Sequence, residues 1–114
     1  MNWMTLCSKS ELREDYPHAA QVGGREIGIF LLDNQYYALD NRCPHAEARL
    51  SQGFIEDGQV ECPLHEARFD LRSGRCTHMP QYGGTGVRSY PVRVQGEDIQ
   101  VQIQRPLESQ EQMA

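Results

Sequence analysis

Hydrophobic residues in this chain fall in short runs of strand length, separated by residues that favour turns. Residues 26–32 are rich in Ile, Phe and Leu, and Asp33-Asn34 leads from them into a second apolar run at 36–39. Asp and Asn are favoured in tight turns between paired strands. These residues therefore predict a β-hairpin.

A second pair of runs lies near the end of the chain. Residues 92–95 alternate Val with polar residues, and residues 99–103 alternate Ile and Val with Gln. Period-two alternation is typical of a strand with one buried face. With Gly-Glu-Asp at 96–98 as the turn, the pattern predicts a second hairpin. The capping-box spacing of Ser8 and Glu11 predicts one helical turn near the start.

The organisation of the chain follows from these elements. Its 114 residues suit one domain, which we expect over residues 1–104, and the polar residues 105–114 are predicted to form a frayed tail. Residues 41–86 are rich in Gly and Pro and hold six of the Cys and His residues. The fold class is therefore predicted as all-β, with two hairpins as a base and a loop-rich lobe at about 41–86 inserted between them.

Charge and hydropathy exclude several classes of protein. Sixteen acidic against eleven basic residues give a net charge of −5, which argues against nucleic-acid binding. No run approaches the roughly 20 apolar residues that span a bilayer, and the N-terminus has no signal-peptide pattern. A cytoplasmic location is expected. In that reducing compartment, cysteines are more often metal ligands or buried thiols than disulfides.

The chemistry lies in two boxes, Cys43-Pro44-His45 and Cys62-Pro63-Leu64-His65. Two thiolates and two imidazoles suit a thiophilic metal centre. A structural zinc site is one interpretation, although its usual spacing pairs Cys with Cys and His with His. A Rieske [2Fe–2S] centre is the other, because two cysteines hold one iron there and two histidines hold the other.

The boxes resemble those of Rieske-type [2Fe–2S] ferredoxins, the electron-transfer components of bacterial aromatic-ring-hydroxylating oxygenase systems. The likeness covers about residues 3–103. It extends to framework segments on either side of the boxes: Ala38-Leu39-Asp40-Asn41, Leu50-Ser51-Gln52-Gly53, Phe69-Asp70-Leu71-Arg72-Ser73-Gly74 and Tyr90-Pro91-Val92-Arg93-Val94.

This resemblance implies the Rieske fold, in which an antiparallel β-sheet base carries a smaller loop-rich cluster-binding lobe. It implies one [2Fe–2S] cluster. Carried over position by position, Cys43 and Cys62 would bind one iron, and His45 and His65 would bind the other. These four residues are the expected cofactor-binding and metal-ligating set, and no catalytic residue is expected.

The resemblance also implies a function. The chain would be a soluble ferredoxin, not catalytic alone, that carries single electrons from a flavin-dependent NAD(P)H reductase to a terminal ring-hydroxylating oxygenase. Its potential is expected to be low. Ala48 and Leu64 replace the two cross-linked cysteines of the membrane-bound respiratory type, and Ala67 and Phe69 replace residues whose hydroxyls donate hydrogen bonds to sulfur.

Two alternative functions remain open. The small subunit of an NAD(P)H-dependent nitrite reductase shares the fold, and a zinc-stabilised interaction module would use the same four ligands without redox chemistry. The oxygenase itself is excluded, because its mononuclear iron needs two His and a carboxylate, and only His18 and His78 remain.

The remaining candidates have simpler interpretations. Cys7 and Cys76 are predicted to be small apolar core residues. His78 is predicted in a loop near the cluster, and His18 on the surface. Met79-Pro80 is expected to form part of a third loop that shields the cluster.

Glu47 lies two residues after His45, and Glu66 directly follows His65. Acidic side chains beside the ligands suggest a docking face for a basic partner. An ordinary solvated surface explains them as well.

Overall fold

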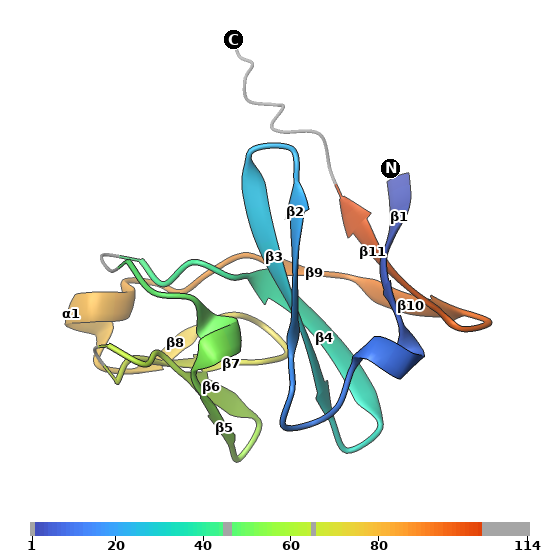
Figure 1. The fold of residues 1–114 in the computed structure, drawn as a ribbon. Coiled ribbons are helices and arrows are strands. Elements are labelled where there is room, and N and C mark those ends of the chain that lie inside the picture. Colours follow the sequence, from blue (N-terminus) through green and yellow to red (C-terminus); the bar gives the residue numbers. More distant parts are fainter. Residues whose placement is uncertain (1, 45–46, 65, 104–114) are drawn as a thin grey trace, which may run out of the picture.

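The computed structural model describes residues 2–44, 47–64 and 66–103. Within these ranges the strands form three antiparallel sheets joined by turns and short helical segments (Figure 1). The all-β prediction is confirmed. His45, His65 and the predicted tail at 105–114 lie outside the described residues, and the domain limits of 1–104 stay a prediction.

The central sheet has the strand order β2-β3-β4-β9. Its strands are β2 (His18–Val22), β3 (Arg25–Leu32), β4 (Gln35–Asp40) and β9 (Ser89–Tyr90). The predicted first hairpin is β3–β4, and its two turn residues Asp33 and Asn34 both have positive φ, at 51° and 63°. This is the backbone of a two-residue hairpin turn that Asp and Asn tolerate.

The second sheet has the order β1-β11-β10, with β1 at Asn2–Ser8, β10 at Val92–Gln95 and β11 at Asp98–Ile103. The predicted second hairpin is present, but its turn is shorter than expected because Asp98 already pairs with Gln95. Its buried face lies mainly on β11. Val94 is 40% exposed, and β10 is the edge strand of this sheet in the part of the chain that the structure describes.

The third sheet lies within the predicted loop-rich lobe and was not itself predicted. Its order is β5-β6-β7-β8, with strands at Phe54–Glu56, Gln59–Glu61, Arg68–Asp70 and Cys76–His78. Each strand has three residues, which is too few for period-two alternation to stand out in the sequence. The lobe at 41–86 is therefore a small sheet that carries loops.

Figure 1 shows the third sheet on one side of the central sheet and the second sheet on the other. Each junction has its own buried cluster of apolar side chains. Ile27, Ile29, Ile99 and Val101 belong to the cluster on the side of the second sheet. Phe30 points into the cluster of the lobe. Strand β3 thus contributes to both cores.

Helical structure in the described ranges is short. Segments η1 (Lys9–Glu11) and η2 (Leu50–Gln52) are single 3₁₀ turns, and α1 (Pro80–Gly83) has four residues. The predicted turn after Ser8 is confirmed as η1, where the Ser8 amide donates to the Glu11 carboxylate at 2.8 Å. In the part of the chain that the structure describes, no helix is long and apolar enough to cross a bilayer.

Candidate metal centre

Two loops of the lobe close in the same way. The Cys43 amide donates to the Ala48 carbonyl at 3.0 Å, and the Cys62 amide donates to the Ala67 carbonyl at 2.7 Å. Five positions separate donor and acceptor in each loop. The first cluster loop (residues 43–48) and the second cluster loop (residues 62–67) therefore present a cysteine at the same place.

The similarity between the two loops extends to the residues just outside these two backbone hydrogen bonds. Arg42 pairs with Arg49 in an isolated antiparallel bridge, and Glu61 pairs with Arg68 at the end of strands β6 and β7. Each second-loop position lies nineteen residues after its first-loop counterpart. The bases of the two cluster loops thus have the same pattern of backbone pairing.

Both cysteines are enclosed by the lobe. The Cys43 side chain is 1% exposed and that of Cys62 is not exposed at all, and the two belong to one buried apolar cluster. The other buried members are Phe30, Leu39, Ala48, Leu50, Val60, Ala67, Phe69 and Leu71. Such surroundings keep water away from whatever the thiols bind.

The two thiols are close enough to affect each other's proton affinity. Burial raises the pKa of Cys43 to about 12, and the neighbouring Cys62 thiol and then Cys76 add to the increase. Without a cation, Cys43 is therefore a neutral thiol at physiological pH. A thiophilic metal must displace this proton when it binds, so metal binding releases protons.

Only half of the predicted ligand set lies within the described residues. Cys43 and Cys62 are brought together as the sequence predicts, whereas His45 and His65 fall outside. No group of three or more ligating side chains occurs among the residues that the structure covers. The donor chemistry that is described, two buried adjacent thiols in apolar surroundings, fits an iron–sulfur centre.

Cys76 and His78 correct two smaller expectations. Cys76 packs against the cluster that holds Cys43 and Cys62, but it is partly exposed and its thiol donates to the His78 carbonyl at 3.3 Å. His78 is the last residue of strand β8 rather than a loop residue, because it pairs with Arg68 of strand β7. Met79 also packs on this core.

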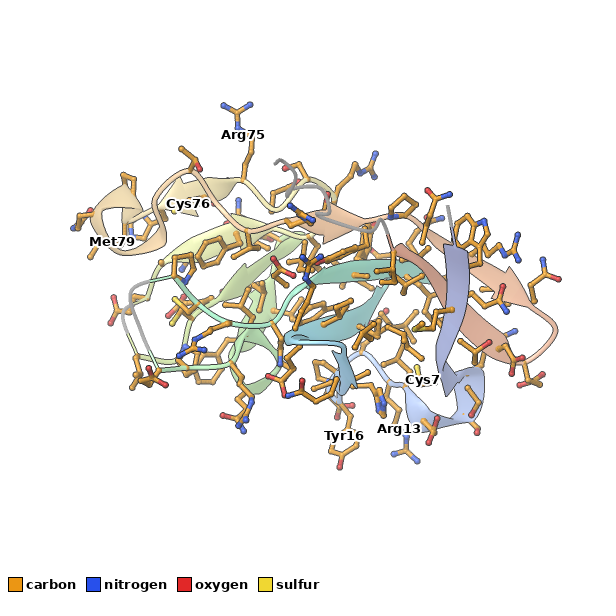
Figure 2. All side chains as sticks on the ribbon, turned by 90° about the horizontal axis from the view of Figure 1, so that it is seen from above. Cys7, Arg13, Tyr16, Arg75, Cys76 and Met79 are labelled. Carbon is orange, nitrogen blue, oxygen red and sulfur yellow. The ribbon has the colours of Figure 1, made fainter. Side chains whose placement is uncertain are left out.

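Figure 2 shows Cys76 and Met79 together at one end of the molecule, far from Cys7. Cys7 is 5% exposed within the core beside the second sheet, as predicted. His18 is partly exposed in strand β2.

The disulfide of the respiratory type has no counterpart at these positions. Ala48 is buried and Leu64 is 59% exposed. All four cysteines, which are Cys7, Cys43, Cys62 and Cys76, are free thiols. The two cluster loops are held by hydrogen bonds and apolar packing instead of a covalent bridge.

Residues 2–91 match the model of the Rieske [2Fe-2S] domain. The chain belongs to this family. A Rieske domain holds one [2Fe–2S] cluster, so the family match decides against the zinc interpretation of the two boxes.

Characterised relatives of this Rieske domain are ferredoxins. It is 33% identical to the ferredoxin component of the naphthalene 1,2-dioxygenase system of Pseudomonas aeruginosa, over 89% of this chain and 95% of the relative. It is 36% identical to the anthranilate 1,2-dioxygenase ferredoxin subunit of Burkholderia cepacia, over 89% and 92%.

Solved structures agree. The ferredoxin of carbazole 1,9a-dioxygenase from Nocardioides aromaticivorans IC177 matches with a TM-score of 0.82 and 34% identity, covering 91% of this chain and all of that one. A putative NADH-dependent nitrite reductase small subunit from Mycobacterium tuberculosis matches less closely, with a TM-score of 0.78 and 27% identity. Ferredoxins of dioxygenase systems thus occur both among the similar sequences and among the similar solved structures.

Proposed function

We propose that this chain is a Rieske ferredoxin that carries single electrons to a terminal aromatic-ring-hydroxylating oxygenase. The proposal rests on relatives at 33% and 36% identity that span nearly the whole chain and are ferredoxins of ring-attacking dioxygenases. A flavin-dependent NAD(P)H reductase is the proposed electron donor. The chain transfers electrons without transforming a substrate itself, and a cytoplasmic location is part of the proposal.

The proposed ligands are Cys43 and Cys62 for one iron and His45 and His65 for the other. The observation that carries this assignment is the repeated loop closure, which presents two buried thiols side by side. Each box places its histidine two or three residues after its cysteine, within the same cluster loop. When bound, the cluster takes up and returns one electron.

The protein around the thiols favours a low reduction potential. Ala67 and Phe69 are fully buried next to Cys43 and Cys62, and neither has a hydroxyl. Hydrogen bonds to the cluster sulfurs stabilise the added negative charge, so fewer donors lower the potential. We expect a midpoint in the lower part of the Rieske range of about −150 to +300 mV.

The surface beside the cluster loops suits brief contact with a partner. Leu64, Glu47 and Glu66 are all exposed there. The two cluster loops thus expose an apolar side chain and two carboxylates, and small interfaces are typical of electron carriers that must exchange partners. The ring compounds named for the relatives differ, which fits a carrier that need not contact the ring substrate.

Reconstitution tests the proposal. The purified chain is mixed with NADH and with the reductase and oxygenase components of the naphthalene and anthranilate systems. We expect ring hydroxylation that requires the chain and is lost in Cys62→Ser. A chain that holds its cluster, supports neither system and instead restores activity to a nitrite reductase large subunit would contradict the proposal.

A further inference from the structure

Asn41 is a fully buried polar residue directly after strand β4, two residues before Cys43. A buried amide must find hydrogen-bond partners, because leaving it unpaired costs stability. The partners of Asn41 are Leu50 and Ser51, which follow the first cluster loop, and Glu26 in strand β3. Its position and burial therefore suggest a task in shaping that loop.

The contacts of Asn41 hold the far end of the first cluster loop. Its backbone carbonyl accepts from the Leu50 amide at 2.7 Å, and its side-chain Oδ1 accepts from the Ser51 amide at 2.8 Å. Its Nδ2 donates to Ser51 Oγ at 2.8 Å. Asn41, which precedes Cys43 by two residues, thus holds Leu50 and Ser51, where the chain continues after the first cluster loop.

The same amide also ties the loop to the central sheet. The side-chain Nδ2 of Asn41 donates to Glu26 Oε1 at 3.3 Å, and the backbone N–H of Asn41 donates to the Glu26 carbonyl at 2.9 Å. Glu26 in turn accepts from Arg49 Nε at 2.8 Å. Glu26 of strand β3 therefore contacts Asn41, which precedes the first cluster loop, and Arg49, which follows it.

The second cluster loop has no need of such a clasp. Its counterpart of Asn41 is Val60, a buried apolar residue that pairs with Phe69 in the ladder of β6 and β7. Below this loop the regular sheet continues, and Glu61 and Arg68 add an ion pair of 3.1 Å. The pairing of strands β6 and β7 therefore continues up to the base of this loop.

The first cluster loop lacks this support. Its base is the isolated bridge between Arg42 and Arg49, with no strand ladder beneath it among the described residues. Each arginine is paired with a carboxylate, Arg42 with Glu47 and Arg49 with Glu26. In this loop, the side chain of Asn41 takes the place that a β-ladder has under the second.

We propose that Asn41 is a positioning residue for the iron–sulfur cluster, which it serves by clasping the first cluster loop so that Cys43 and the loop amides keep their places. This inference rests on the proposed ligation by Cys43. A loosened loop would hold Cys43 less firmly, and it would weaken any hydrogen bond that the loop amides would give to a bound cluster. Loss of the clasp should therefore speed iron release and lower the midpoint potential.

Three variants of the cluster-loaded protein test this inference. Asn41→Leu keeps the branched shape and removes every side-chain hydrogen bond. Ser51→Ala removes the one hydroxyl that Asn41 Nδ2 reaches. Ser73→Ala is the matched control, because the Ser73 hydroxyl donates to Asp70 at 2.9 Å in another turn of the same lobe and does not contact Asn41.

Iron transfer to a chelator is timed well below the unfolding temperature, and the midpoint potential and the unfolding temperature are measured alongside. We expect release to be at least tenfold faster in Asn41→Leu and roughly fivefold faster in Ser51→Ala, as for the loss of one hydrogen bond of ordinary strength. Ser73→Ala should stay within twofold of the unsubstituted protein. The potential should fall in Asn41→Leu.

Equal release rates and potentials in all proteins would overturn the inference, as would a Ser73→Ala variant as fast as Ser51→Ala. If Asn41→Leu does not fold, the comparison of the two serine variants decides alone. An unsubstituted protein that holds no iron or sulfide would instead overturn the proposed function, so the two failures are distinguishable.

Discussion

Gly28 lies directly against Asn41: a Cβ added to Gly28 would come within 2.5 Å of Asn41 Oδ1. Glycine inside a strand often marks a place where another group must approach closely. Here the group is the buried amide that contacts the first cluster loop. The central sheet therefore makes room for the cluster lobe at one specific position.

Gly28→Ala should destabilise the protein and loosen the first cluster loop. The added methyl would also contact the Phe30 ring at 3.0 Å, so either the amide or the ring must shift. We expect a loss of about 1–3 kcal/mol in the free energy of unfolding, as for other overpacked cores. Gly24→Ala is the control, since a Cβ there meets nothing within 4 Å. Equal stability of the two variants in urea unfolding would contradict this prediction.

Phe69→Tyr and Ala67→Ser should raise the reduction potential. Each adds a hydroxyl at a position that is fully buried beside the two cysteines. A donor near sulfur stabilises the reduced state, whereas the present side chains offer none. Redox titration of the unsubstituted protein should give a midpoint below about +100 mV within the Rieske span. A higher value, or no increase in either variant, would show that the donor argument is wrong.

Glu66→Gln should slow reduction by the proposed flavin-dependent reductase more than Glu47→Gln does. The Glu47 carboxylate is already paired with Arg42 at 2.9 Å, whereas Glu66 has no ion pair among the described residues. Exposed charges are screened beyond about 8 Å at physiological ionic strength, so added salt should slow the same step.

Glu97→Gln provides the control for docking, because Glu97 lies in the β10–β11 turn, on the side of the molecule away from the lobe (Figure 1). Stopped-flow reduction rates of the three variants decide the matter. A rate that is independent of salt and equal in all of them would remove the docking role of the two carboxylates.

Tyr90→Phe should destabilise the protein at neutral pH but not at high pH. The Tyr90 hydroxyl donates to Asp40 and accepts from Arg25 Nη1 at 3.1 Å. Burial, and then Asp40, raises the pKa of Tyr90 to about 12 from an ordinary value of 10.0. The folded protein thus holds this proton more tightly than the unfolded chain, which stabilises the fold below pH 10.0 and stops doing so as the pH approaches 12.

Unfolding by urea at several pH values checks this prediction. At pH 7 the variant should lose about 1.5–3 kcal/mol, the usual contribution of a hydrogen bond to a charged group. The difference between the two proteins should narrow above pH 10.0. A constant difference up to pH 12 would mean that the phenol proton does not contribute.

The sequence predicts most of the base and the two metal boxes because their signals are local. The β3–β4 turn needs two residues with positive φ, and Asp33 and Asn34 supply them. The boxes combine Cys and His at a spacing that few other sites use. Such features depend on a handful of neighbouring residues and do not require knowledge of the tertiary structure.

The support of the first cluster loop could not be predicted in this way. Asn41 looks like an ordinary turn residue beside the box, and its burial follows from contacts with Glu26 and Ser51, which lie fifteen and ten positions away. The third sheet was missed for a related reason. Strands of three residues, such as β7 with its single buried Phe69, carry too little pattern to be recognised.

The central claim is that this chain holds two irons and two sulfides between two cysteines and two histidines. Protein purified anaerobically should be coloured, contain iron and acid-labile sulfide in equal amounts, and give a paramagnetic resonance signal after reduction that is lost in Cys43→Ser. Colourless protein that contains zinc, or no metal and no sulfide, would contradict the claim.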